Sequence, residues 1–70
     1  SKMREWLTDL RTAKEWNKAQ TAKKLGVTRQ YYGGIESGDR MKRLSIPFAS
    51  KIASVFGEKL DKIIKLEMGK

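Results

Sequence analysis

The chain has 70 residues, of which 39% are hydrophobic and 34% charged, enough for one small domain near the lower limit for a chain that buries its own core. We therefore expect a single domain over residues 1–70. Cysteine and histidine are absent, which removes disulfides, zinc-thiolate sites and the commonest general base. The 8 acidic residues form no paired-carboxylate cluster, and no glycine-rich phosphate loop occurs. We expect no enzymatic activity, metal, cofactor or small-molecule substrate.

The distribution of charge is uneven, with a formal net charge of +8. Residues 16–35 carry four basic side chains and no acidic one: Lys18, Lys23, Lys24 and Arg29. A second basic group follows: Arg40, Lys42 and Arg43. A local excess of positive charge is typical of proteins that bind a polyanion. On charge alone, a lysine-rich solvated surface is the alternative.

The first two predicted elements are amphipathic helices. Four apolar residues with the spacing of one helix face predict a helix over about 3–14: Met3, Trp6, Leu7 and Leu10. Asn17 is a suitable N-cap for a second helix over about 18–25, which ends at Gly26. Three residues of this second helix are expected to point inward: Thr21, Ala22 and Leu25.

A third helix is expected over about 30–36, with Val27 facing the core and Thr28 as its cap. Gly33 and Gly34 lie side by side within it. Each glycine in a helix interior costs roughly 1 kcal/mol relative to alanine. Either the helix ends early, at Tyr32, or a helix face without side chains is needed.

A polar, basic loop over 37–44 leads to a fourth helix, with Ser45 as its cap, Pro47 in its first turn and Gly57 at its end. Its expected apolar stripe has five members: Ile46, Ala49, Ile52, Ala53 and Phe56. A fifth helix is expected over about 59–67, with the apolar residues Leu60, Ile63, Ile64 and Met68. No segment alternates polar and apolar residues as a strand would, so we predict a compact all-α fold of five helices.

Helical geometry separates two faces of the third helix. With Tyr32 pointing inward, Thr28, Ile35 and Glu36 lie near the core direction. The far side carries Gln30, Gly33, Gly34 and Ser37, with Arg29 and Tyr31 on the flanks. The DNA major groove accepts a helix, arginine suits the edge of guanine, and glutamine suits that of adenine. We therefore predict base readout by Arg29, Gln30, Gly33 and Gly34, against the alternative of an ordinary polar surface.

The segment "AQTAKKLGVTRQYYGGIE" has the spacing of a helix-turn-helix, with a small residue at Ala22, a turn at Gly26 and an apolar plug at Val27. Together with "IESG" and "SIPFASKIASVFG", it resembles the Xre-type family of phage repressor and Cro proteins over about residues 4–64. The sequence departs from the family pattern at Lys18, Thr21 and Leu44.

This resemblance implies a lambda-repressor-like domain that binds double-stranded operator DNA as a homodimer. It implies an ion pair between Arg11 and Glu36, which would hold the third helix against the first. It also implies contacts with the DNA backbone from five residues: Lys18, Ser37, Arg40, Lys42 and Arg43. Thr28 and Tyr31 are further candidates for backbone contact. For Tyr31, a ring that covers the edge between the second and third helices is the alternative.

The function that we predict is sequence-specific regulation of transcription, as a repressor, in the cytoplasm of a bacterium and encoded by it or by a phage. The alternative is an antitoxin that uses the same domain to bind its own promoter and a protein partner. An RNA-binding module is less favoured, because the sequence lacks the aromatic platform expected for single-stranded bases.

Overall fold

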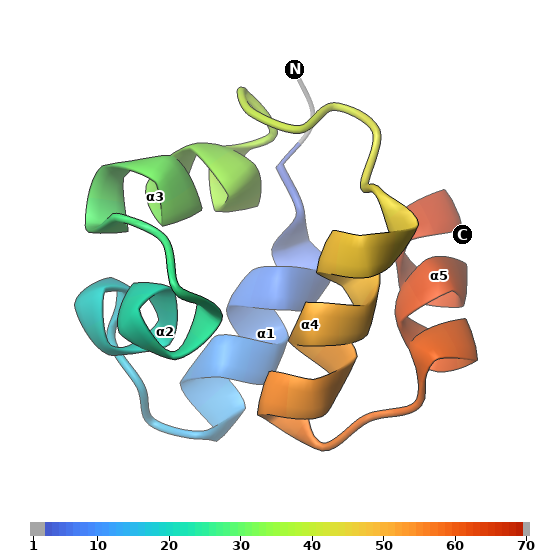
Figure 1. Ribbon diagram of the computed structural model, residues 1–70, viewed down its shortest axis with the longest axis horizontal. Helices are drawn as coiled ribbons and strands as arrows, with labels where there is room; N and C mark the ends of the chain where they lie inside the picture. Colours follow the sequence, from blue (N-terminus) through green and yellow to red (C-terminus); the bar gives the residue numbers. More distant parts are fainter. Residues whose placement is uncertain (1–2, 70) are drawn as a thin grey trace.

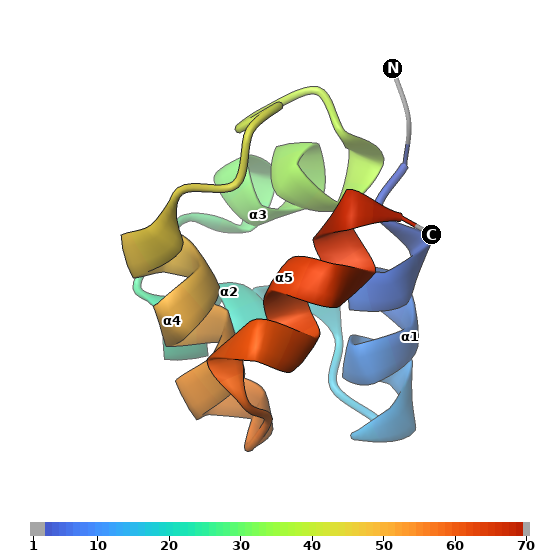
Figure 2. The same cartoon turned by 90° about the vertical axis from the view of Figure 1, so that its right-hand side faces the viewer.

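The computed structural model describes residues 3–69. It contains five α-helices: α1 (Glu5–Ala13), α2 (Lys18–Leu25), α3 (Arg29–Ser37), α4 (Ile46–Phe56) and α5 (Leu60–Met68). Among these residues no strand occurs, so the predicted all-α class is confirmed. α3 and the loop after it lie along one edge of the molecule (Figure 1). α5 crosses the opposite face between α4 and α1 (Figure 2).

The helix boundaries follow the predicted capping residues. The Asn17 side chain accepts a hydrogen bond from the Gln20 amide at 2.7 Å, and the Gln20 side chain accepts one from the Asn17 amide at 2.8 Å. The side chains of Thr28 and Ser45 cap α3 and α4 by accepting from the amides of Tyr31 and Phe48, without a reciprocal bond. α2 has the predicted bounds, whereas α1 begins two residues later than predicted and α5 is displaced by one residue.

The glycine pair does not end α3, which continues through both residues to Ser37. The helix stops at Gly38, where the backbone is left-handed with φ 87°. The alternative that α3 ends at Tyr32 is therefore wrong. The loop begins one residue later than predicted, at Gly38.

The core lies where the five helices meet and takes residues from each of them. Its buried hydrophobic members are Leu7, Ala22, Leu25, Tyr32, Ile35, Ala49, Ile52, Ala53, Phe56 and Ile63. Thr21 is also buried, and its hydroxyl donates to the Asn17 carbonyl at 3.0 Å. That hydrogen bond explains how a polar residue can stand where the resemblance favours a larger apolar one.

Three residues that we assigned to apolar stripes do not belong to the core. Met3, Ile46 and Met68 are 59%, 57% and 80% exposed. Met3 precedes α1, Ile46 is the first residue of α4, and Met68 is the last of α5. Periodicity predicts the face of a helix but not how far along the helix the neighbouring elements reach.

Glu36 is a charged residue within the core, only 3% exposed, and its carboxylate is fully engaged in hydrogen bonds. Its Oε2 accepts from Arg11 Nε and from the Tyr32 hydroxyl, both at 2.6 Å. Its Oε1 accepts from the Thr8 hydroxyl at 2.9 Å. Arg11 also donates to the Trp16 carbonyl at 2.9 Å. The ion pair that the resemblance implied is thus part of a cluster that joins α1 to α3.

The cluster shifts the pKa values of its members in the directions that hold it together. Burial raises the pKa of Glu36, but hydrogen bonds from Arg11, Tyr32 and Thr8 outweigh it and leave the pKa below its ordinary value of 4.5. The hydrogen bond with Glu36 raises the pKa of Arg11. Burial and then the neighbouring carboxylate raise the pKa of Tyr32, which keeps the hydroxyl a donor. The ionised form of Glu36 is therefore the form that the fold selects.

Substituting Glu36→Ala should lower the free energy of unfolding by about 3–5 kcal/mol, because it leaves the half-buried guanidinium of Arg11 and the buried hydroxyl of Tyr32 without their acceptor. The measurement is urea denaturation followed by circular dichroism. Glu58→Ala is the control, because Glu58 pairs with Lys62 at 3.1 Å on the surface. A surface pair of this kind contributes only about 0.3–0.5 kcal/mol. Equal losses in the two variants would contradict a bracing role for Glu36.

Acid should remove the contribution of Glu36 to stability. A carboxyl whose pKa is lower in the folded chain stabilises the fold above its unfolded pKa, and this stabilisation is lost as the pH falls through the folded pKa. The stability difference between the wild-type protein and Glu36→Gln should therefore be full near neutral pH and shrink below the ordinary value of 4.5. Denaturation of both proteins across this range is the measurement, and a difference independent of pH would refute the assignment.

Candidate nucleic-acid interface

The two faces of α3 differ as its geometry predicted, except at Thr28, which was expected near the core direction and is exposed because it is the N-cap residue that precedes the helix. Tyr32 and Ile35 are buried against the core, whereas Arg29 and Gln30 in the first turn are exposed. Gly33 lies four residues after Arg29 and therefore continues the exposed face. The result is a helix that presents two long polar side chains at its start and bare backbone in its middle.

The two glycines have different surroundings. A Cβ atom added at Gly33 would meet no atom within 4 Å, so this face of the helix is open. At Gly34 the added Cβ would lie 2.5 Å from Cγ of Arg40, and the Arg40 amide donates to the Gly34 carbonyl at 3.0 Å. The expectation of two equally bare glycines is thus wrong, because the returning loop lays the stem of Arg40 across Gly34.

Arg40 is held on the exposed side of α3. Its guanidinium carbon lies 5.6 Å from the centre of the Tyr31 ring, within the range of a cation–π contact. Tyr31 is half-buried and Arg40 is exposed. The loop therefore returns a positive charge to the helix that carries Arg29 and Gln30.

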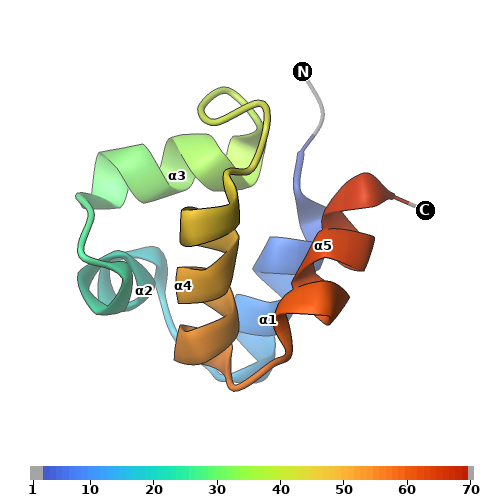
Figure 3. The same ribbon diagram turned by 45° about the vertical axis from the view of Figure 1, so that its right-hand side comes forward.

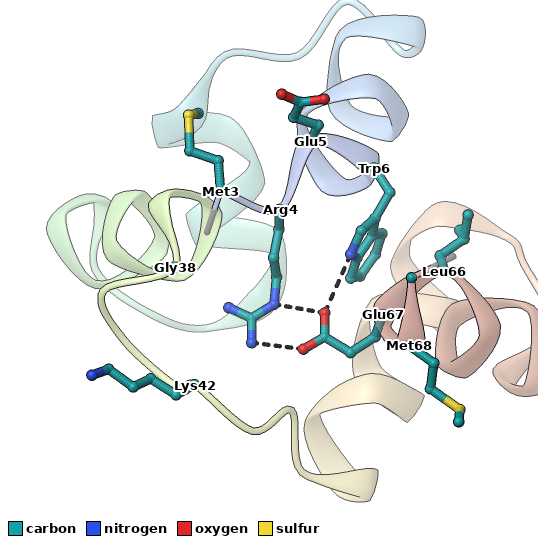
Figure 4. Close-up of a pocket in the computed structure, with 10 residues that line it drawn as sticks. Met3, Arg4, Glu5, Trp6, Gly38, Lys42, Leu66, Glu67 and Met68 are labelled. Carbon is teal, nitrogen blue, oxygen red and sulfur yellow. Dashed lines mark hydrogen bonds and ion pairs between the residues drawn. The ribbon is translucent and has the colours of Figure 1, made fainter. Parts of the chain in front are cut away.

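The remaining residues predicted to contact the DNA backbone fall into two groups. Lys18, Lys42 and Arg43 are exposed, and Lys42 extends away from the body of the domain in Figure 4. α3 and the loop that carries Lys42 and Arg43 lie along the same edge in Figure 3, while Lys18 begins α2.

Ser37 and Thr28 are engaged within the chain. Ser37 Oγ lies 3.0 Å from the Gly34 carbonyl and 3.1 Å from an Asp39 carboxylate oxygen. Thr28 Oγ1 accepts from the Tyr31 amide at 3.0 Å. Thr28 therefore keeps its hydroxyl proton for a further acceptor, whereas the single proton of Ser37 already has two acceptors within the chain.

Arg4 is the charged residue that the sequence reasoning missed. It is 5% exposed, and its guanidinium forms a two-point ion pair with Glu67 of α5, with both N–O distances 2.9 Å (Figure 4). It also donates to backbone carbonyls of α3 and of the following loop. Its position just before α1 could have indicated a special role. A positive charge is unfavourable at the N-terminus of a helix, so an arginine there suggests a partner elsewhere in the fold.

Within residues 3–69, no three acidic, cysteine or histidine side chains gather in a way that could hold a metal ion. None of the helices there combines the length and the apolar character needed to cross a membrane.

The comparisons with known proteins agree with this geometry. The helix-turn-helix family model matches residues 7–63. Over 64 residues, or 91% of this chain, the sequence is 36% identical to the HTH-type transcriptional regulator AnsR of Bacillus subtilis (strain 168). The chain spans about half the length of this relative, 53%. No solved structure matches the chain significantly. The chain therefore belongs to the Xre-type helix-turn-helix family of DNA-binding transcriptional regulators.

Proposed function

We propose that this protein is a sequence-specific regulator of transcription that places α3 in the major groove of double-stranded DNA. The observation that carries the proposal is the exposed face of α3, where Arg29 and Gln30 stand beside the open backbone of Gly33. A helix with this face can approach base edges closely and offers donors suited to guanine and a donor–acceptor pair suited to adenine. The mode of regulation that we propose is repression, by occlusion of a promoter in the bacterial cytoplasm.

Positive charge beside α3 supports the same assignment. Arg40 is held over Tyr31, and Lys42 and Arg43 are exposed on the following loop. Lysine and arginine in such places lie along phosphates and fix the orientation of a protein on DNA without reading its sequence. We propose that these residues, together with Lys18 at the start of α2, contact the DNA backbone.

We further propose that the protein binds as a homodimer to a two-fold related site, with half-sites about one helical turn apart. The exposed apolar side chains on the α5 side of the domain favour this arrangement. Met3 and Met68 line the same surface groove, next to the end of α5. The groove is also lined by Gly38 and Lys42 of the loop after α3, but not by Arg29 or Gln30, so a dimer formed on its α5 side would leave the start of each recognition helix accessible.

Selection from random duplex DNA should yield one preferred, two-fold symmetric site. Arg29→Ala should cost about 1–3 kcal/mol of binding free energy on that site and relax the preference at one base-pair position per half-site. Lys65→Ala is the charge-matched control, because Lys65 is an exposed residue of α5, and it should leave the preference unchanged. Equal binding of the wild-type protein to all duplexes would refute sequence-specific regulation.

The two glycines should respond differently to alanine. Gly33→Ala has free space for its methyl group and should stabilise α3 by roughly 1 kcal/mol, while weakening binding to the selected duplex because the methyl group keeps the backbone away from the bases. Gly34→Ala should gain less stability, because Arg40 must move. Thermal denaturation and titration with the selected duplex measure both effects. A Gly33→Ala variant that binds as tightly as the wild-type protein would contradict close approach at this residue.

A further inference from the structure

Arg4, just before α1, connects the end of α5 to the loop that follows α3. On one side its guanidinium meets the Glu67 carboxylate of α5 at two points. On the other side it donates to the Ile35 carbonyl at 2.8 Å, to the Arg40 carbonyl at 3.3 Å and to the Met41 carbonyl. Figure 4 shows the side chain reaching from the segment before α1 into this space.

These contacts use every donor of the guanidinium. Arginine has five N–H groups and no acceptor. Nε donates to Glu67, the first terminal nitrogen donates to two carbonyls, and the second donates to Met41 and Glu67. Because the residue is also buried, Arg4 has neither a free donor nor the access to contact a phosphate itself.

The backbone groups that Arg4 holds belong to the segment that presents the basic loop. Ile35 lies in the last turn of α3, and the Arg4 amide also donates to the neighbouring Glu36 carbonyl at 2.7 Å. The Ile35 carbonyl also accepts from the Gly38 amide at 3.3 Å, and the guanidinium of Arg4 adds a charged donor at this end of the helix. Met41 has φ 52°, a left-handed conformation that side chains rarely adopt, so the loop backbone there depends on contacts that hold it.

Glu67 is what allows a buried arginine at this place. A buried guanidinium needs a charged partner, and Glu67 provides the ion pair. The Trp6 indole donates to the same carboxylate at 3.2 Å, which fixes its orientation. The position of the loop after α3 thus depends on a side chain near the end of α5.

We propose that Arg4 is a positioning residue for DNA binding, which, held by Glu67, fixes the loop backbone so that Arg40, Lys42 and Arg43 meet the phosphates as a preformed set. This inference rests on the proposed function of α3 and the loop. It adds that the last turn of α5 controls the affinity for DNA through the ion pair of Glu67 with Arg4.

The variant Glu67→Gln tests the proposal, because it has two effects that change the affinity for DNA in opposite directions. It removes one negative charge, which by itself strengthens attraction to DNA. It also replaces one of the two carboxylate oxygens by an amide nitrogen, which cannot accept from Arg4. The loss of this hydrogen bond loosens the loop that Arg4 holds. Glu58→Gln is the matched control, since it makes the same change of charge and breaks only the exposed pair with Lys62.

Binding of both variants to the duplex selected by the wild-type protein is measured over a range of salt concentrations, at a temperature where circular dichroism shows all three proteins folded. Glu67→Gln should bind about tenfold more weakly at about 0.1 M salt, with the slope of log affinity against log salt reduced by about one, as for one lost phosphate contact. Glu58→Gln should bind at least as tightly as the wild-type protein. A Glu67→Gln variant that matches Glu58→Gln, or that loses affinity without a change of slope, overturns the proposal.

Amide hydrogen exchange in the free proteins separates this proposal from the proposed function. In these DNA-free samples, Glu67→Gln should speed exchange at the amides of residues 40–43 and leave those of α2 unchanged. If the wild-type protein selects no duplex, the proposed function fails, and the exchange result alone decides whether Glu67 and Arg4 hold the loop. Unchanged exchange at residues 40–43 would refute the claim that Arg4 and Glu67 fix the backbone of the loop.

Discussion

The buried carboxylate of Glu36 is the constraint on which the orientation of α3 depends. A charge in the core is tolerated only when it is paired and hydrogen-bonded, and Glu36 receives donors from Arg11 and Thr8 of α1 and from Tyr32 of its own helix. These donors lie in fixed directions, so α3 can rotate about its axis only by losing them. The far side of α3, which includes Gln30, is thereby turned to solvent, and Arg29 is exposed on its flank in the first turn.

A second polar cluster, formed by Arg4 and Glu67, contacts the end of the same helix next to the cluster around Glu36. Arg4 donates through its amide to the Glu36 carbonyl and through its side chain to Ile35. Together they tie the last turns of α3 to α1 by side chain and by backbone, and Glu67 extends the connection to α5. Among the described residues no buried side-chain nitrogen or oxygen lacks a partner, so both clusters are complete.

The structure explains the two adjacent glycines of α3 in different ways. Gly33 leaves the exposed face of α3 open, as expected of a helix that must approach another molecule closely. Gly34 instead makes room within the protein, because the loop lays Arg40 across it toward Tyr31. In a domain of marginal stability the glycine pair weakens its own helix, and at Gly34 the structure shows an internal contact that a side chain would obstruct.

The sequence by itself determined the helices, their caps and the two faces of α3, because capping and periodicity are local properties of a few neighbouring residues. It also indicated the pairing of Arg11 with Glu36, through the resemblance to a family. Only the tertiary structure decided that Arg40 covers Gly34 and that Arg4 binds Glu67, 63 residues away along the chain. The same holds for the exposure of Met3, Ile46 and Met68. Such contacts depend on how the loop returns and where the helices end against one another, which no local pattern specifies.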